Sequence, residues 1–174
     1  MGIGSGSEKR TKTMGQIGVI GASDASPEEY EAARTVGKLI AENHETLVCG
    51  GLSGVMEGAC KGAKEQDGLT VGIVPDTGNG NHYLDVVIRT GQGHGRNVLV
   101  VQSADSVIAI GGGHGTLSEI AIALRIKRRV FGIHTWDIPG VKQCATPEEA
   151  VLMAVHAARH SPSYRSLRDG PGSP

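Results

Sequence analysis

The sequence has few aromatic residues and no excess of charge of either sign. Phe, Trp and Tyr together make up 3% of its 174 residues, and 17 Lys and Arg against 18 Asp and Glu give a formal net charge of −1. A protein that binds nucleic acid or an anionic membrane needs a basic excess to neutralise phosphates, and a single-strand binder needs rings on which bases stack. The composition therefore argues against both functions and predicts an aliphatic core.

Cysteine is scarce as well. Cys49, Cys60 and Cys144 are odd in number and separated in the sequence, with no Cys-x-x-Cys pair and no Cys/His cluster. This argues against a disulfide framework and a structural zinc site, so we predict no metal site and a reducing, cytoplasmic location. The longest apolar runs are a handful of residues, whereas spanning a bilayer takes ~20.

The two ends of the chain differ from its body. Residues 1–14 contain glycine and basic residues with no apolar segment after them, which does not fit a signal peptide. Residues 161–174 are rich in Ser, Pro, Gly and Arg. We expect a flexible arm over 1–14, a single folded domain over 15–160 and a flexible tail over 161–174.

The body alternates short aliphatic runs with stretches of helical periodicity. The runs predict strands over residues 16–20, 46–49, 69–74, 86–88, 106–110 and 129–133. The stretches between them predict helices that begin at Ser26, near Gly54, at Arg96, near Thr116 and at Thr146. Apolar strands that alternate with helices are typical of a parallel sheet covered on both faces. We therefore predict an α/β fold, a three-layer, doubly wound, Rossmann-like parallel sheet.

Three glycine-rich turns each follow a predicted strand. In a doubly wound sheet such turns lie at the carboxyl edge, where ligands bind. Glycine lets backbone amides approach an anion, and a helix that follows adds free N–H groups and the positive end of its dipole. The predicted phosphate-binding residues are Gly21, Ser23, Gly50, Gly51, Gly54, Gly112, Gly113, His114, Gly115 and Thr116.

These turns match neither of two common nucleotide-binding motifs. No Gly-Lys-Ser/Thr follows the glycines as in a Walker A loop, and Gly21-Ala-Ser-Asp breaks the G-x-G-x-x-G fingerprint. The alternative is that the glycines only shorten connections between elements. Because two Gly-Gly turns precede predicted helices, we favour phosphate binding.

Arg96-Asn97 and the segment over residues 104–119, Ala-Asp-Ser-Val-Ile-Ala-Ile-Gly-Gly-Gly-His-Gly-Thr-Leu-Ser-Glu, resemble the LONELY GUY (LOG) superfamily. Its enzymes carry an Arg-Lys pair and a Pro-Gly-Gly-x-Gly-Thr-x-x-Glu motif. Here Gly111 replaces the motif proline and Asn97 replaces the lysine. The resemblance is closer to the short branch, which includes the molybdenum-cofactor carrier proteins. The name lysine decarboxylase, often given to members, does not fit because the sequence has no setting for a pyridoxal-binding lysine.

The resemblance implies a catalytic arginine at Arg96 and a catalytic acid at Glu119. Enzymes of this kind release the base from a nucleoside 5′-monophosphate. A carboxylate can stabilise the positive charge that develops on the ribose or orient the attacking water. However, Thr116-x-x-Glu119 also has the spacing of a capping box, in which the glutamate only satisfies the helix start. Both interpretations stay open at this stage.

Two hypotheses of function result. The first is a carrier-like protein that binds a phosphorylated nucleotide or a nucleotide-like, molybdopterin-type cofactor; the residues themselves identify no cofactor, and the resemblance implies molybdenum cofactor as the bound ligand. The second is a nucleoside 5′-monophosphate phosphoribohydrolase that uses Arg96 and Glu119. The changes at Gly111 and Asn97 favour binding. A nucleotide sensor that acts through a partner is a third alternative, and the resemblance further implies a homodimer or larger homo-oligomer.

Overall fold

A parallel sheet of seven strands forms the centre of the computed structural model, which describes residues 14–161. The strands are β1 (Gln16–Gly21), β2 (Thr46–Cys49), β3 (Thr70–Val74), β4 (Val86–Arg89), β5 (Ser106–Ile110), β6 (Val130–Ile133) and β7 (Val141–Gln143). Within the described residues the helices are α1 (Pro27–Glu42), α2 (Val55–Lys64), the 3-10 helix η1 (Gly93–Arg96), α3 (Asn97–Ser103), α4 (His114–Arg125) and α5 (Pro147–Arg159). The flexible arm and tail expected at the two ends lie outside the described residues, apart from Met14 and Ser161.

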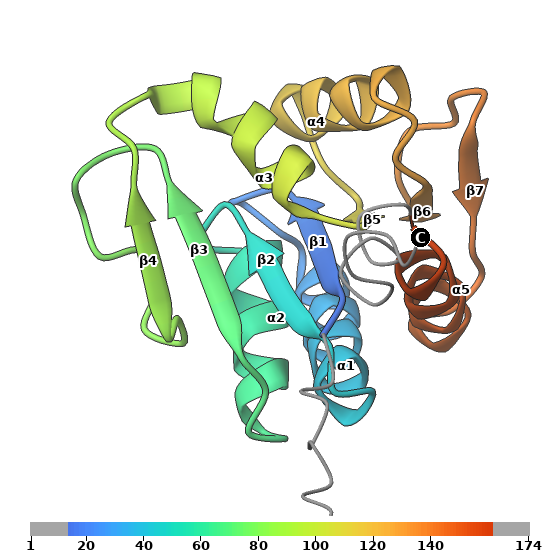
Figure 1. Ribbon diagram of the computed structural model, residues 1–174, viewed down its shortest axis with the longest axis horizontal. Helices are drawn as coiled ribbons and strands as arrows, with labels where there is room; N and C mark the ends of the chain where they lie inside the picture. Colours follow the sequence, from blue (N-terminus) through green and yellow to red (C-terminus); the bar gives the residue numbers. More distant parts are fainter. Residues whose placement is uncertain (1–13, 162–174) are drawn as a thin grey trace, which may run out of the picture.

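The sheet is doubly wound, as the sequence predicted. The strand order is β4-β3-β2-β1-β5-β6-β7, and every neighbouring pair is parallel. One core cluster joins the sheet to α1, α2 and α5, and a second joins the opposite face to α3 and α4, which gives three layers (Figure 1). The order reverses between β1 and β5, and ligands bind at such a switch point in open α/β sheets.

Burial explains why these segments form strands. Every residue of β2 and of β5 is buried, and all but the first residue of each strand, Thr46 and Ser106, is apolar. Helices α1 and α2 approach closely through Gly37 and Gly62, where an added Cβ would lie 1.8 Å from a backbone oxygen of the other helix. No helix within residues 14–161 has both the length and the apolar character needed to cross a bilayer.

The structure differs from the sequence-based elements in three places. Helix α4 begins at His114 rather than near Thr116, with Gly113 as its N-cap. The capping-box interpretation was therefore wrong, because Thr116 and Glu119 both lie inside the helix. Strand β7 was not predicted, since its three residues, Val-Lys-Gln, show no distinctive apolar pattern. The turn before α3 forms η1, so Arg96 lies at the junction of two helical segments.

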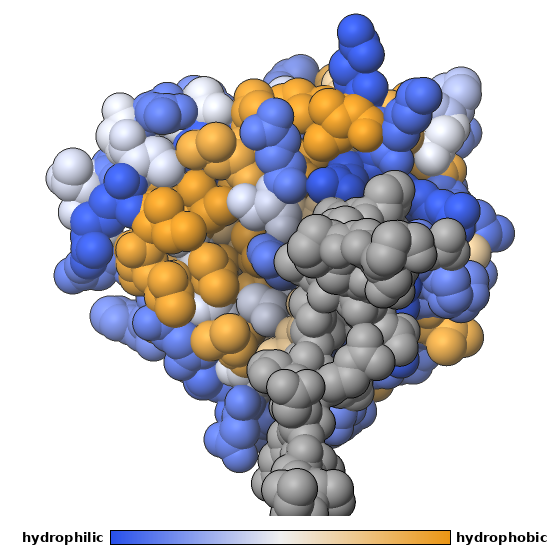
Figure 2. Space-filling model, viewed as in Figure 1, coloured by the Kyte–Doolittle hydropathy of each residue, from blue (hydrophilic) through white to orange (hydrophobic). Residues whose placement is uncertain are grey.

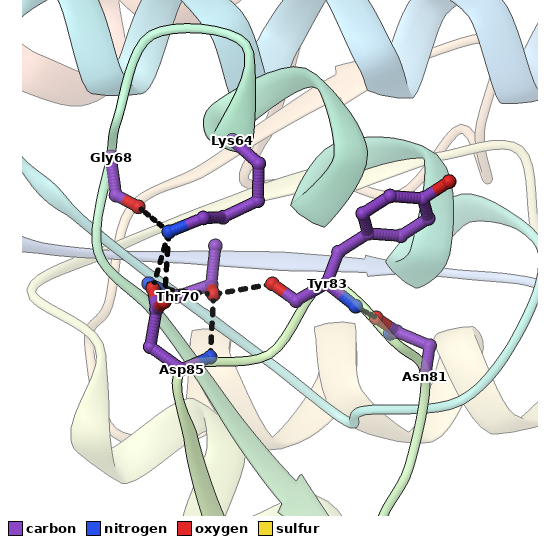
Figure 3. Close-up of polar contacts among 6 residues, drawn as sticks. All are labelled: Lys64, Gly68, Thr70, Asn81, Tyr83 and Asp85. Atoms are coloured by element: carbon purple, nitrogen blue, oxygen red, sulfur yellow. Dashed lines mark hydrogen bonds and ion pairs between the residues drawn. The ribbon is translucent and has the colours of Figure 1, made fainter.

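A polar cluster fixes the strand β4 beside β3 (Figure 3). Lys64 at the end of α2 forms an ion pair of 2.8 Å with Asp85. Asp85 also accepts a hydrogen bond from the backbone N–H of Thr70, and the Thr70 hydroxyl donates to Tyr83 O over 2.7 Å. The Asn81 side chain accepts from Tyr83 N in the same connection, so the cluster holds the segment that carries Asn81 against the sheet.

Candidate functional site

A cleft of about 300 Å³ opens at the carboxyl ends of β1, β2 and β5, beside the switch point. We call it the central cleft. Four segments contribute its lining: Gly21, Ala22, Ser23 and Asp24 after β1; Leu52 and Met56 after β2; His94, Arg96 and Asn97 around η1; and Gly113, Gly115, Thr116 and Glu119 on the turn and first half of α4.

The N-terminus of α4 reaches the central cleft with unbonded N–H groups. The first backbone bond that enters the helix runs from Leu117 N to Gly113 O over 3.0 Å. The N–H groups of His114, Gly115 and Thr116 therefore precede the helical ladder. The N-cap residue is Gly113, so no N-cap side chain accepts a hydrogen bond from these N–H groups. These donors and the positive end of the helix dipole form an arrangement that binds phosphate in other proteins.

The loop after β6 holds the carbonyl groups of the turn that leads into α4. Thr135 Oγ1 donates to Gly111 O over 2.6 Å, and Trp136 Nε1 donates to Gly113 O over 3.4 Å. The His114 ring lies near the Trp136 indole, with ring centroids 6.3 Å apart. Because these two carbonyl oxygens accept hydrogen bonds from the loop, the groups of the turn that remain available to a ligand are its N–H groups.

The shape of this turn requires glycine at two positions. Gly111 has a φ of +51°, and its N–H donates to Ile133 O over 3.0 Å. Proline can do neither, because its ring fixes φ near −65° and removes the N–H. Gly112 has a φ of +105°, and a Cβ there would lie 2.3 Å from Thr116 Oγ1. Gly111, which replaces the motif proline, thus gives the turn a backbone conformation and a hydrogen bond that proline cannot provide.

Arg96 and Glu119 meet in the wall of the cleft as a buried pair. Arg96 Nη1 lies 3.8 Å from Glu119 Oε1, and each side chain is only 8% exposed. Arg96 Nη2 also donates to Gly50 O over 3.2 Å, while the buried Nε has no hydrogen-bond partner. Burial raises the pKa of Glu119 to about 7, with the Arg96 charge acting in the opposite direction. The site therefore holds a cation with spare donor capacity next to a carboxyl group that titrates near neutral pH.

Asn97 links this arginine to α4. Its side-chain oxygen accepts a hydrogen bond from Arg96 Nη1, and its amide nitrogen donates to Ser118 Oγ over 3.1 Å. Ser118 in turn donates to Gly115 O over 2.6 Å. A lysine, the residue of the family motif, has no acceptor and could not receive the Arg96 bond. The asparagine therefore holds Arg96 in place where the motif has a second cation.

The turn over residues 50–54 is hydrogen-bonded to segments that line the cleft. Gly51 O accepts from Asn81 N over 2.9 Å, and the Asn81 side chain donates to Leu52 O over 3.0 Å. Ser53 Oγ donates to Ser23 O over 2.9 Å, which joins this turn to the one after β1. Together with the Gly50 contact to Arg96, these bonds make the turn a support for the lining residues.

The sequence-predicted residues fall into two groups. Those that line the central cleft are Gly21, Ser23, Arg96, Gly113, Gly115, Thr116 and Glu119. Those that lie next to the cleft without being part of its lining are Gly50, Gly51, Gly54, Gly112 and His114. The predicted site residues did not include Leu52 or Met56; Met56 lies in a segment that shares the family resemblance, and the place of both residues after β2 could have suggested a role in the cleft. Their side chains add apolar surface to the cleft.

Another cavity, of about 380 Å³, lies at the starts of α1 and α5. The carboxylates of Glu28 and Glu29 line it, with Ile110, Ile133 and Ala32 among its apolar residues. Two acidic side chains, with no Lys or Arg among the described residues that line it, make it a poor place for an anion. The central cleft is therefore the candidate for phosphate.

Sequence comparisons give a family and two relatives. The model of the SLOG cluster4 family matches residues 14–160. An uncharacterized protein of Archaeoglobus fulgidus is 49% identical over 145 residues, which cover 82% of this chain and 96% of the relative. A probable cytokinin riboside 5′-monophosphate phosphoribohydrolase of Oryza sativa is 27% identical over 120 residues, 66% of this chain and 52% of that protein. The match thus spans about half the length of the rice protein.

Two of the solved structures with the same fold are molybdenum cofactor proteins. The molybdenum cofactor binding protein of Rippkaea orientalis is 36% identical, with a TM-score of 0.78 over 82% of this chain and 96% of its own. The molybdenum cofactor carrier protein of Chlamydomonas reinhardtii is 33% identical, with a TM-score of 0.76 over 82% of this chain and 98% of its own. Both coverages show that the similarity extends over nearly the whole length of these two proteins.

Proposed function

Because the chain belongs to the SLOG cluster4 family, we propose that its central cleft binds the phosphate of a phosphorylated nucleotide or of a molybdopterin-type cofactor. The observation that carries this proposal is that two groups suited to bind phosphate face one cleft. The N-terminus of α4 offers the N–H groups of residues 114–116, and Arg96 offers a buried guanidinium whose Nε has no partner. A helix N-terminus and an arginine together bind phosphate more strongly than either does alone.

The rest of the cleft fits the remainder of such a ligand. Leu52 and Met56 provide apolar contact for a planar ring, and Ser23 and Asp24 provide polar groups for hydroxyls. The names of the Rippkaea and Chlamydomonas proteins favour molybdenum cofactor, a phosphorylated pterin, as the cargo. In this arrangement the chain's own residues hold the phosphate and the organic ring, in a carrier-like role.

Replacing Thr116 by valine tests the phosphate position. Thr116 lines the cleft with a hydroxyl that can donate to a phosphate oxygen. We expect Thr116→Val to weaken AMP binding by about tenfold, the loss of one hydrogen bond to a charged group. Calorimetric titration with AMP measures this, and Thr77→Val, which changes an exposed threonine outside the cleft, is the control. Equal affinity of Thr116→Val and wild type would remove Thr116 from the phosphate site.

The Arg96–Glu119 pair favours a second candidate, hydrolysis of the N-glycosidic bond. In this reaction water attacks C1′ of the ribose, the bond to the base breaks, and the base leaves with a proton. A carboxyl group with a pKa of about 7 can take the proton of the water at neutral pH. The likeness to the rice phosphoribohydrolase supports the same chemistry.

Incubation with AMP separates the two candidates. A binding protein retains AMP intact, whereas a phosphoribohydrolase releases free adenine that chromatography detects. We expect binding without release. Adenine release that disappears in Glu119→Gln, while AMP binding persists, would instead establish the enzyme. Mass spectrometry of small molecules that co-purify with the protein then identifies the ligand.

We extend the proposal to a cytoplasmic homodimer or larger homo-oligomer. Apolar side chains gather on the face drawn in Figure 2, over the region of β3 and β4. Val86 and Ile88 of the edge strand β4 are 44% and 45% exposed, a high value for aliphatic residues on a sheet. Analytical ultracentrifugation measures the oligomeric state directly.

A further inference from the structure

The fold brings two of the three cysteines together behind the central cleft. The sulfur atoms of Cys49, at the end of β2, and Cys60, in the middle of α2, are 3.5 Å apart. Both residues are fully buried, and both are free thiols. The number and spacing of the cysteines argued against a disulfide framework, yet these two sulfurs need to move only a short distance to bond.

The surroundings of the two sulfurs differ in a way that favours reaction. Cys49 Sγ accepts a hydrogen bond from Gly51 N–H over 3.3 Å. The Cys60 thiol, as donor, lowers the pKa of Cys49; Gly51 N–H and the Arg96 charge act in the same direction, whereas burial and the Glu119 charge oppose them. The same sulfur contact and burial raise the pKa of Cys60. Cys49 is thus suited to act as the thiolate, and Cys60 as the protonated partner that resolves it.

We propose that Cys49 and Cys60 are an oxidisable dithiol whose disulfide alters the central cleft. With hydrogen peroxide as oxidant, the Cys49 thiolate attacks one peroxide oxygen, the O–O bond breaks, and hydroxide leaves. The Cys60 sulfur then attacks the resulting sulfenic acid on Cys49 and displaces its oxygen as water, which takes up the Cys60 proton. Two thiols lose two electrons, and one peroxide is reduced to two waters.

The disulfide acts on the cleft through the segment that it closes. Residues 49–60 contain the 50–54 turn, which holds Arg96 through Gly50 O, and the first turn of α2, where Met56 lines the cleft. A disulfide requires the sulfurs to move from 3.5 Å to about 2.05 Å. Because this movement draws α2 towards β2, it displaces the turn relative to Arg96. We expect oxidised protein to bind AMP about tenfold more weakly, the effect of one lost bond to a charged group.

Tryptic mapping tests whether the bond forms. Trypsin cuts after Lys38 and Lys61 and finds no site between them, so one peptide, residues 39–61, carries both cysteines. Folded protein is treated with hydrogen peroxide, unfolded, alkylated and digested. We expect this peptide to be lighter than its reduced form by the mass of two hydrogen atoms and to take up no alkylating reagent. The peptide with Cys144 provides an internal control and should stay fully alkylated.

Two variants sharpen this test. Cys144→Ser keeps the pair and should give the same light peptide as wild type. Cys60→Ser removes the resolving thiol and should give none. Alkylation of both cysteines after peroxide treatment would overturn the proposal, as would an oxygen added to Cys49 with Cys60 still alkylated. Because peptide mapping of the wild type locates the bond, the conclusion does not depend on how well Cys60→Ser folds.

The affinity measurement rests on the proposed function, whereas the peptide map does not. AMP is titrated into reduced and oxidised wild-type protein, and Trp136, the single tryptophan of the chain, reports binding by fluorescence because its indole contacts Gly113 O. Weaker binding that dithiothreitol reverses is the expected result. A disulfide with unchanged AMP affinity would overturn the link to the cleft. A reduced protein that binds no AMP would refute the proposed function while leaving the peptide map to decide on the dithiol.

Discussion

Replacing Arg96 by methionine is expected to weaken AMP binding by about 10- to 100-fold, the range for losing a hydrogen bond to a charged group. Within residues 14–161, the buried guanidinium is the one Lys or Arg side chain that lines the central cleft, and its Nε is without a partner. Methionine keeps much of the length and the apolar stem of arginine but provides no donor. Calorimetry at neutral pH gives the affinity. Arg89→Met, which removes an exposed arginine bonded to Asn79, is the matched control.

The structure also predicts that Arg96→Met changes Glu119. Without the cation, burial alone acts on the Glu119 carboxyl, so its pKa rises further. The variant should therefore keep its fold at mildly acidic pH, where Glu119 is protonated. Circular dichroism in that range separates lost binding from lost structure. A folded Arg96→Met protein with wild-type AMP affinity would exclude Arg96 from the phosphate site.

Replacing Glu119 by glutamine is expected to change how stability depends on pH. The carboxyl has its ordinary pKa of 4.5 in the unfolded chain and a pKa of about 7 in the folded protein. Between these values the folded protein binds more protons than the unfolded chain, so wild-type stability falls as pH rises from 4.5 towards 7. This difference in pKa corresponds to about 3 kcal/mol of unfolding free energy. The contribution is fully present below 4.5 and lost above about 7.

Glu119→Gln removes this titration, so its unfolding free energy should fall less than that of wild type across the same interval. Denaturant titrations at several pH values measure the two curves. Glu148→Gln changes an exposed glutamate and should follow the wild-type curve. Parallel curves for wild type and Glu119→Gln would show that Glu119 titrates in its ordinary range, and the argument for a general base at neutral pH would lose its support.

Much of the fold could be predicted from the sequence because its apolar runs coincide with buried strands and its capping patterns coincide with the starts of helices. The apolar runs that form β1, β2 and β5 are buried, and Ser26 and Thr146 cap α1 and α5 as their Ser/Thr-Pro-Glu-Glu patterns indicated. The resemblance to the LOG and molybdenum-cofactor carrier superfamily is confirmed by the family match and the solved structures. These features depend on residues close together in the chain.

The parts that sequence reasoning missed depend on contacts between distant residues. Thr116 and Glu119 have the spacing of a capping box, but the backbone of Gly111 and Gly112 lets α4 begin earlier, at His114. No local pattern shows that Gly50 O would hold Arg96 or that Asn97 would bond to Ser118. The Cys49–Cys60 contact likewise appears only once α2 packs on β2.

The central claim is that the N–H groups at the start of α4 bind a ligand's phosphate. The most direct test is nuclear magnetic resonance of isotope-labelled protein titrated with AMP and, separately, with adenosine. AMP should shift the amide signals of residues 113–116 in a saturable manner, and adenosine, which lacks the phosphate, should leave these four signals unchanged. If AMP leaves them unchanged while shifting signals elsewhere, or if adenosine shifts them as much as AMP does, the claim is contradicted.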